Sequence, residues 1–336
     1  MATEKKPEYS PGLAGVIAGE TAICWVDPNA GLMYRGYDIH EMGDKATFEE
    51  VAYLLLNGEL PNGKQLKDFK QQIAAQRDLP KEVVEMLRLL PKSTHPMDML
   101  RTGVSMLSAF DKDLSDNSHD ANIRKSIRLI ARVSTLITDG WRILHGEKPL
   151  PEKPELSQAA NFFYKLNGKA PEAWQTRMLD TIFNLYAESM KMLEDIKTPD
   201  RAEAWLKKQL AAKAKIMGFG HRVYKKGDSR VPIMREIAHD LGKRTGKENW
   251  VLICEKLEEV MDREKGLCAN VDLYAAPVFW MLGFAPALNT PLFAASRVAG
   301  WCAHVVEQHD NNRLIRPRSL YTGPQLRKYP GPVDRS

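Results

Sequence analysis

A single histidine, His221, lies in a segment whose composition suits the binding of an anion. The segment "KIMGFGHRVYKKGDSR", residues 215–230, places the ring between a Gly-Phe-Gly step and the bases Lys225 and Arg230. Glycines let a backbone approach another group closely, and lysine and arginine bind anions. The fragment is not a dinucleotide-binding fingerprint, because it lacks the third glycine and a preceding strand. We interpret the glycines as clearing space for ligands beside a functional histidine; the alternative is a histidine with no catalytic task.

One carboxylate and one strong base stand out in the most apolar part of the chain. Between Val271 and Val306, Asp272 is the only acidic residue and Arg297 the only lysine or arginine. Unpaired charges are costly inside apolar helices. One interpretation is therefore structural: the two residues form an ion pair, or Asp272 caps the helix that follows Asn270. The other is chemical, since a carboxylate in an apolar site is a suitable general base and an arginine can hold an anionic substrate.

An arginine-rich turn near the C-terminus adds to this set. Residues 313–324, "RLIRPRSLYTGP", contain three arginines, with Arg316 beside Pro317. Alone, the turn would be an ordinary solvated surface. Together with Arg230 and Arg297 it would form a site for a molecule with several carboxylates, because a guanidinium group binds a carboxylate through two parallel hydrogen bonds. A histidine, an isolated acid and several arginines indicate carbon–carbon bond chemistry on a polycarboxylate.

The elements that must position these residues are almost all helical. Residues 20–39 predict a β-hairpin, since two β-prone runs flank a Pro-Asn-Ala-Gly turn. Thr47 and Glu50 form the capping box of a following helix, and the apolar residues of 122–144 recur at helical spacing. Residues 172–196 have the same amphipathic pattern. The chain is therefore predicted to be an all-α protein with one small N-terminal β-hairpin.

The composition excludes several classes of protein. The 336 residues carry a net charge of +5 without a run of five or six like charges, which argues against a nucleic-acid-binding tail. The four cysteines are scattered without a CxxC pair, so neither a disulfide framework nor a metal site is expected, and a reducing cytoplasm is the natural compartment. The sequence shows no secretory signal and no uninterrupted apolar run of membrane-spanning length. We predict a cytoplasmic protein that binds neither nucleic acid nor membrane.

Several segments resemble, in order, the signature blocks of the citrate synthase family. The match extends from about Pro11 to Pro324 and is closest to the shorter bacterial and archaeal members. The blocks near the N-terminus are "GLAGVIAGETAICWVD", "YRGYDIHEM", "ATFEEVAYLLLNGELP" and "HPMDMLRTGVSML". Those that follow are "GFGHRVYKKGDSR", "NVDLYAAPVFWMLG", "ASRVAGWCAHVVEQ" and "IRPRSLYTGP".

The resemblance implies a fold and a reaction. The citrate synthase-like fold has a large helical domain, here residues 1–187 and 286–336, and a small mobile domain, 188–285, that closes over substrate in a homodimer. The reaction condenses acetyl-CoA with oxaloacetate and water to give citrate and CoA in the tricarboxylic acid cycle. The coenzyme A thioester is a substrate, and no tightly bound cofactor or metal is implied. A 2-methylcitrate synthase, which uses propionyl-CoA, is an alternative, since the acyl groups differ by one methylene.

The resemblance also assigns roles to residues. His221 would bind and polarise the oxaloacetate ketone, Asp272 would take a proton from the acyl-CoA methyl group, and Lys225 would face a coenzyme A phosphate. The arginines that would bind the oxaloacetate carboxylates are Arg230, Arg297 and Arg316, the last reaching the site of the partner subunit. We expect these arginines to converge on one anion site. We also expect Asp272 to be buried or nearly so, close to His221 across a cleft between the domains.

One stretch departs from the family pattern. The family has a block like "HEFNAST", two core helices and a block like "GPLHGGANE", whose histidine stabilises the enol of the acyl-CoA. Here "DTIFNLYA" runs directly into "ESMKMLEDI", so about thirty to forty-five residues are missing at usual element lengths. His145, in "LHGEK", is only a superficial substitute, because its proline-rich surroundings indicate a surface loop.

Two hypotheses follow from this departure. Either the chain is an active synthase whose molecule has a segment between Ala187 and Glu188 that this sequence skips, or it is a non-catalytic homologue that binds oxaloacetate or coenzyme A. Loss of two buried helices would expose a large apolar surface, which few folds could absorb. We therefore predict the first: Ala187 and Glu188 should not be bonded, and their Cα atoms should lie clearly farther apart than the about 3.8 Å of neighbouring residues.

Overall fold

The structure of the 336-residue chain is a computed structural model. The residues that it describes are Ser10, Ile17, 19–27, 31–185, Ile196, 198–214, 216–221, Tyr224 and 227–313. Lys225, Arg316 and the junction of Ala187 with Glu188 lie outside these residues, and the predictions made for them stay predictions.

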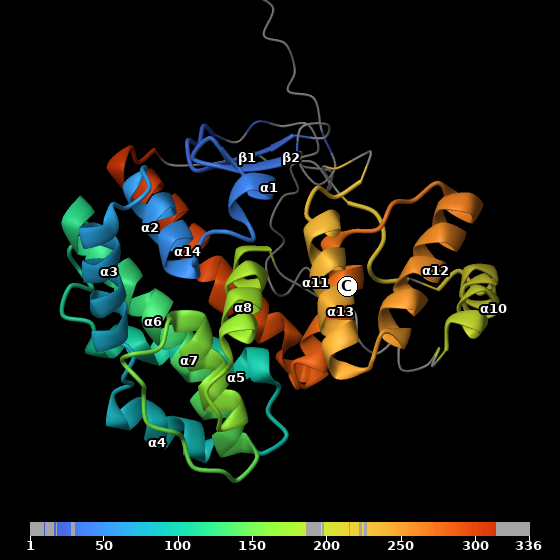
Figure 1. The fold of residues 1–336 in the computed structure, drawn as a ribbon. Coiled ribbons are helices and arrows are strands. Elements are labelled where there is room, and N and C mark those ends of the chain that lie inside the picture. The colour runs from blue at the N-terminus through green and yellow to red at the C-terminus, as the bar shows by residue number, and fades with distance from the viewer. Residues whose placement is uncertain are drawn as a thin grey trace, which may run out of the picture.

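Helices form most of the described structure, and the predicted all-α class is confirmed (Figure 1). The helices that precede the junction are α1 (Ile39–Met42), α2 (Phe48–Asn57), α3 (Gly63–Ala75), α4 (Lys81–Leu89), α5 (Pro96–Leu107), α6 (His119–Leu144), α7 (Gln158–Asn167) and α8 (Ala173–Leu185). Those that follow are α10 (Pro199–Ala211), α11 (Val231–Thr245), α12 (Asn249–Lys265), α13 (Val271–Met281) and α14 (Asn289–Asp310). Short 3₁₀ turns are η2 (Ser108–Phe110) and η3 (Pro286–Leu288).

The N-terminal hairpin is confirmed and is larger than predicted. Strands β1 (Cys24–Asp27) and β2 (Gly31–Tyr34) pair antiparallel, with Cys24 opposite Tyr34. A third strand, β3 (Tyr37–Asp38), extends the sheet on the other edge of β2. This sheet lies over the helices on one side of the molecule, where β1 and β2 close one end of the pocket described below (Figure 1).

Local signals in the sequence explain where the helices begin and end. The Thr47 side chain accepts the N–H of Glu50, and the Glu50 carboxylate accepts the N–H of Thr47 at 2.8 Å, so α2 starts with the predicted capping box. Gly58 ends this helix in the left-handed conformation, at φ 88°. Pro96 is the first residue of α5, a position where the missing N–H costs nothing. The predicted helix over 122–144 is α6, which begins three residues earlier, at His119.

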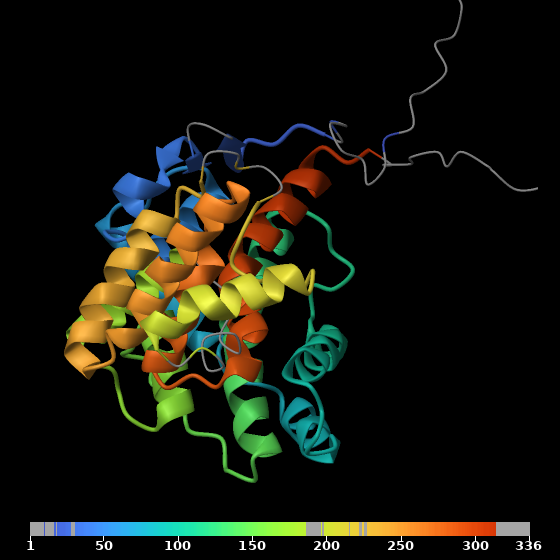
Figure 2. The same cartoon turned by 90° about the vertical axis from the view of Figure 1, so that its right-hand side faces the viewer.

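The helices form two groups. Helices α10–α13 pack mainly on one another, whereas α14 runs along α6 and α2 within the other group (Figures 1 and 2). The groups meet where α8 contacts α11. The long amphipathic pattern over 172–196 corresponds in its first half to α8, which the structure describes as far as Leu185. We retain the predicted two-domain division, with its limits at 187/188 and 285/286, as a proposal.

One buried carboxylate in the larger group has a raised pKa. Asp180 of α8 accepts the N–H of Phe48 at 3.2 Å and is 6% exposed. Burial, followed by the charge of Glu49, raises the pKa of Asp180 to about 7. The folded protein therefore holds a proton on this group at mildly acidic pH.

Candidate active site

Two loops far apart in the sequence meet at the head of α13. Phe219 and Ala269 form an antiparallel bridge, and the N–H of Gly220 donates to the carbonyl of Cys268 at 2.9 Å. Asn270 completes the pairing, since its N–H donates to Gly218 O at 3.0 Å and its side-chain amide to Gly220 O at 2.9 Å. His221 and the first turn of α13 are thereby held side by side.

The glycines before the histidine serve this packing. Gly218 has φ +86°, a conformation that L side chains rarely adopt, and an added Cβ would lie 3.1 Å from the Cα of Leu273. Gly220 is also left-handed, at φ +73°, with open space around it. The interpretation that both glycines clear space for ligands is therefore corrected: Gly218 lets the backbone approach α13.

His221 is oriented by its own loop. The N–H of Tyr224 donates to His221 Nδ1 at 3.1 Å, and the two rings stack at a tilt, 4.5 Å apart. Because Nδ1 accepts, the hydrogen of the neutral imidazole is on Nε2, which makes Nε2 a hydrogen-bond donor. The ring is solvent-exposed and lines the main pocket. It can thus donate a hydrogen bond to a carbonyl oxygen of a ligand.

A buried aspartate fixes Arg230. The side chain of Asp228 is 0% exposed and accepts Nε of Arg230 at 2.9 Å and Nη2 at 2.7 Å. Its Oδ2 also accepts the N–H of Val271, the first residue of α13, at 3.0 Å. Burial alone would raise the pKa of Asp228, but the hydrogen bonds and charge of Arg230 outweigh it and lower that pKa. Asp228 therefore joins the arginine to the head of α13.

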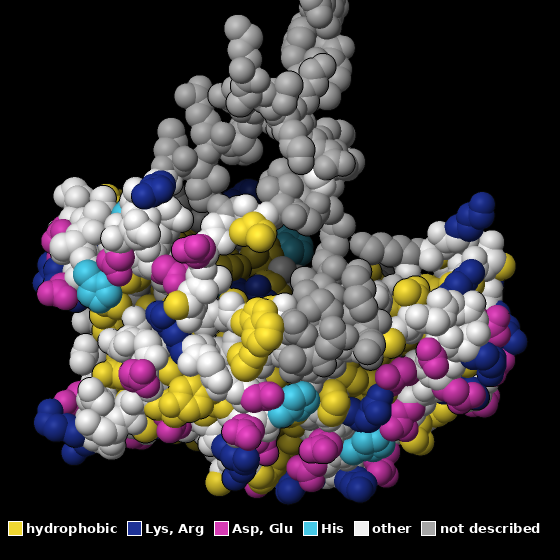
Figure 3. Space-filling view, turned by 90° about the horizontal axis from the view of Figure 1, so that it is seen from above, with side chains coloured by type: hydrophobic (Ala, Val, Ile, Leu, Met, Phe, Trp, Pro, Cys, Tyr) yellow, Lys and Arg dark blue, Asp and Glu magenta, His cyan; other side chains and the backbone are white. Residues whose placement is uncertain are grey.

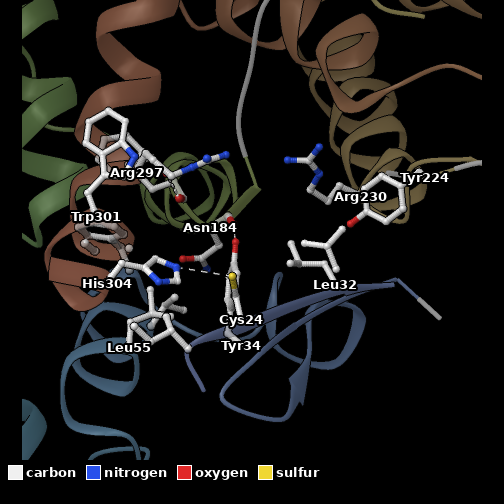
Figure 4. Close-up of a pocket in the computed structure, with 18 of the residues that line it drawn as sticks. Cys24, Leu32, Tyr34, Leu55, Asn184, Tyr224, Arg230, Arg297, Trp301 and His304 are labelled. Atoms are coloured by element: carbon white, nitrogen blue, oxygen red, sulfur yellow. Dashed lines mark hydrogen bonds between the residues drawn. The ribbon is translucent and has the colours of Figure 1, made fainter. Parts of the chain in front are cut away.

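The opposite wall of the pocket is one face of α14. Arg297, Trp301 and His304 follow one another at helical spacing and all line the pocket. Arg297 is exposed, and its guanidinium lies over the ring of Phe293, 4.8 Å from the centroid. His304 Nε2 lies 3.8 Å from the sulfur of Cys24 on β1. The guanidinium groups of Arg297 and Arg230 point toward each other from opposite sides (Figure 4).

The pocket between these walls measures about 330 Å³. Its floor is largely apolar, and Asn184 at the end of α8 also lines it. Viewed from above, the hollow contains hydrophobic side chains with a basic group and a histidine at its sides (Figure 3). Two cationic groups and a hydrogen-bond donor around an apolar floor suit a small molecule with more than one carboxylate.

Two expectations about Asp272 are corrected. It is in the first turn of α13, where its N–H donates to the Asn270 side chain at 3.1 Å, so Asn270 is the helix cap. Asp272 is partly rather than nearly fully buried. It also lies on the same side of the cleft as His221, because the two are joined through the 218–220 and 268–270 pairing.

The structure brings together most of the predicted site residues that it describes. His221, Arg230 and Arg297 line one pocket. Asp272 is not among the lining residues; it lies in the first turn of α13, directly after the segment that pairs with the His221 loop. His145 does not replace the absent histidine: it is exposed at the end of α6, with Nδ1 2.8 Å from Trp141 O. Sequence reasoning missed Asp228 and His304, although each lies within a quoted block. The helical spacing from Arg297 to His304 was the available signal.

The described residues were also searched for metal-binding clusters and membrane-spanning helices. Within the described ranges, no three His, Cys, Asp or Glu side chains are grouped so that they could hold a metal ion. Among the helices that the structure describes, none combines the length and the apolar character that a membrane span requires.

Comparison with known proteins decides the family. A family model described as "Citrate synthase, C-terminal domain" matches residues 12–189 and 187–318. The chain belongs to the citrate synthase family. It is 37% identical to a citrate synthase of Heyndrickxia coagulans, over 94% of this chain and 96% of that protein. It is also 37% identical to a citrate/2-methylcitrate synthase of Bacillus subtilis, over 96% of this chain and 98% of that protein.

Solved structures of citrate synthases have the same fold. The enzyme of Thermotoga maritima superposes with a TM-score of 0.84 at 33% identity, covering 97% of this chain and 99% of that one. A Thermoplasma acidophilum citrate synthase, solved with carboxymethyl coenzyme A and oxaloacetate, gives 0.89 at 27% identity, covering 98% and 100%. The predicted family, the citrate synthase-like fold and the acyltransferase class are therefore confirmed.

The comparisons also locate the departure from the family. The alignment with the Heyndrickxia coagulans protein has 360 positions, but 94% of 336 residues is only about 316, so about 44 positions have no counterpart here. The alignment with the Bacillus subtilis protein gives about 43 in the same way, from 366 positions and 96%. The family model breaks between its two stretches at residues 187–189. This break falls at the junction that sequence analysis singled out.

Proposed function

We propose that the chain binds oxaloacetate in the pocket between α11 and α14 and condenses it with acetyl-CoA, after which water hydrolyses the thioester of the product to give citrate and CoA. The observation that carries this proposal is the opposition of Arg230 and Arg297 across a pocket that His221 also lines. Each guanidinium can hold one carboxylate of a dicarboxylate, and Nε2 of His221 can donate to the ketone between them. Citrate synthases need no tightly bound cofactor, and coenzyme A enters as part of a substrate.

Asp272 is the proposed base. The methyl group of a thioester is a very weak acid, so a carboxylate removes its proton only if the enolate is stabilised as it forms. Asp272 is in the first turn of α13, directly after the segment that pairs with the His221 loop, and this supports its role as the base near the carbonyl that the enolate must attack. The ketone oxygen then gains negative charge, which the Nε2 hydrogen of His221 stabilises.

The other expected roles concern residues outside the described ranges or the assembly. Arg316 would supply a third guanidinium across a homodimer interface, and Lys225 would face a coenzyme A phosphate. Closure of the 188–285 domain over the pocket would exclude water from the thioester. The four cysteines are all free, which supports a reducing cytoplasm as the location.

A non-catalytic homologue that binds oxaloacetate or CoA is the second candidate. Two observations favour it: about 44 aligned positions of a relative have no counterpart here, and the family match breaks at residues 187–189, where the resemblance places the enol-stabilising histidine. Such a protein would retain the arginine pocket and lose turnover. A 2-methylcitrate synthase is a variant of the first candidate, because one methylene is worth only about 1–3 kcal/mol in an apolar pocket.

One set of measurements separates these functions. The intact mass of the purified protein shows whether it contains 336 residues or more. Citrate release is then measured with acetyl-CoA and with propionyl-CoA, and oxaloacetate binding is measured by calorimetry. Turnover with either thioester supports a synthase and its acyl preference. Oxaloacetate binding without turnover supports the non-catalytic homologue, and failure to bind oxaloacetate contradicts both.

A further inference from the structure

A separate cavity of about 940 Å³ lies between α3 and the loop that joins α6 to α7. Its lining residues, all of them described, include none that line the pocket of His221, Arg230 and Arg297. One wall is loop segment 152–157, and Glu49, near the start of α2, also lines the cavity. The other wall is one face of α3, whose lining residues recur at helical spacing: Leu66, Lys67, Lys70, Gln71, Ala74 and Ala75.

The loop wall is fixed by a buried arginine. Arg77 is 1% exposed and donates hydrogen bonds to the carbonyls of Lys153 at 3.1 Å and Leu156 at 2.9 Å. Its Nε donates to the Gln158 side chain at 2.9 Å. A buried guanidinium needs acceptors for its donors, and here the loop provides two of them. Segment 152–157 is therefore a preorganised wall rather than a freely moving surface loop.

The cavity is lined by a buried carboxylate that has one oxygen without a donor. Glu49 is 1% exposed, and its Oε1 accepts the N–H of Gln158 at 2.7 Å. Within the described residues, no group donates a hydrogen bond to its Oε2. Glu152 differs, because the buried Lys165 pairs with it, whereas the carboxyl of Asp180 near Glu49 adds no positive charge. A hydrogen-bond donor or cation supplied by a ligand would therefore stabilise Glu49.

A lysine on the α3 wall provides the opposite charge. Lys70 is partly buried and forms no salt bridge with a residue that the structure describes, whereas Lys64 on the same helix pairs with Asp68 at 2.8 Å. The remaining charged residues of the lining are exposed, so water weakens their interactions: Lys67, Asp78 and Glu155. The cavity thus combines one uncompensated acid, Glu49, with one uncompensated base, Lys70.

We propose that this cavity binds a zwitterionic amino acid, with its ammonium group at Glu49 and its carboxylate at Lys70. An ammonium group supplies the donor that Glu49 Oε2 lacks, and a carboxylate is a suitable partner for a lysine. Much of the remaining lining is apolar and includes Leu66, Ala74 and Leu156, so an apolar side chain suits the cavity. Binding here does not require the condensation reaction proposed above.

The first test compares three small molecules by calorimetry. L-Leucine carries both charged groups, N-acetyl-L-leucine lacks the ammonium group, and isoamylamine lacks the carboxylate. The pH is 8, above the pKa of about 7 of Asp180, so that this carboxyl does not hold a proton that competes for Glu49. L-Leucine should bind about tenfold or more tightly than either analogue. Failure of L-leucine to bind at about 10 mM, or equal binding of isoamylamine, overturns the proposal.

The second test assigns each charged group of the ligand to its partner. Glu49→Gln should weaken L-leucine binding by about tenfold and leave the weaker binding of N-acetyl-L-leucine unchanged. Lys70→Met should weaken L-leucine binding and leave that of isoamylamine unchanged. Lys64→Met is the matched control, because Lys64 lies on α3 outside the cavity, and it should have no effect.

The two variants keep the test decisive if one of them does not fold, because each probes a different end of the ligand. Circular dichroism identifies the variants that fold. A folded variant that weakens L-leucine and the analogue equally contradicts the assignment of that group.

Discussion

The two walls of the pocket hold their arginines in different ways. Arg230, beside α11, makes two side-chain hydrogen bonds to a fully buried aspartate and is 13% exposed. Arg297, on α14, is exposed and lies over an aromatic ring. An ion pair to a buried carboxylate fixes a guanidinium, whereas a long side chain on a helix face can adjust to a ligand. The α11–α13 wall is therefore preorganised. Substitutions there should reduce activity and stability more than substitutions on α14.

The largest effect is expected at the head of α13. Asp272→Asn removes the proposed base but keeps the size of the side chain, so kcat should fall by about 10²–10⁴-fold. Oxaloacetate affinity, measured by calorimetry, should stay unchanged. Asp262→Asn is the control, because it removes an equal charge from an exposed position on α12. A kcat that Asp272→Asn leaves unaltered would contradict the assignment of the base.

Removing the buried aspartate should test the preorganisation of that wall. Asp228→Asn leaves Arg230 without its buried partner charge, so the free energy of unfolding should fall by about 3–5 kcal/mol. The pKa of Asp228 is lowered in the folded state. Its contribution to the free energy of unfolding is therefore present above the unfolded pKa of about 4, and it is lost as the pH falls through the pKa of the folded state. The free energies of unfolding of the variant and the original chain, measured with urea at several pH values, should therefore become equal at acidic pH.

An exposed ion pair provides the control for this experiment. Arg244 and Asp240 lie 2.8 Å apart on α11, with side chains 45% and 50% exposed. Asp240→Asn should cost less than about 1 kcal/mol. An equal loss in both variants would mean that the Asp228 pair is no more important than a surface pair.

Lysine substitutions compare the two walls directly. Arg230→Lys loses the forked contact with Asp228 and displaces the charge, so the KM for oxaloacetate should rise by about 10–100-fold. Arg297→Lys keeps a mobile cation on the exposed face of α14, and the rise should stay below about tenfold. Steady-state kinetics at saturating acyl-CoA measures both. The comparison fails if Arg297→Lys has the larger effect.

The smallest effect is expected at a buried carboxylate outside the pocket. Because the folded pKa of Asp180 is raised to about 7, the folded state binds an extra proton and loses stability as the pH rises from about 4 to 7. Asp180→Asn should therefore raise the free energy of unfolding at pH 8 by about 1–3 kcal/mol and change little at pH 4. Thermal unfolding at both pH values checks this. Destabilisation at pH 8 would show that the ionised carboxylate is required.

Much of the fold followed from local signals in the sequence. The capping box at Thr47, the periodicity of 122–144 and the antiparallel pairing of β1 with β2 each depend on residues that are close in the sequence. The third strand was missed because Tyr37–Asp38 is too short to show alternation. The grouping of α14 with α6 depends on contacts between distant segments, which a single sequence does not encode locally.

The site was predictable in its residue types and less so in its geometry. His221, Arg230 and Arg297, which line one pocket, were singled out because their chemistry is unusual in their surroundings. Asp228 was missed because an aspartate after a glycine looks like an ordinary turn residue, and only burial reveals its role. Gly218 was assigned to the ligand because its contact, Leu273, is 55 positions away and joins it only through the pairing of two loops.

Trp301 has a consequence for communication within the molecule. Its indole lines the pocket and also a largely apolar groove between α5, α6 and α14, so its position is shared by two separate surfaces. If a group bound in that groove restricts the indole and thereby changes the free energy of ligand binding in the pocket, the coupling must be reciprocal. A ligand in the pocket would then change the affinity for that group by the same factor.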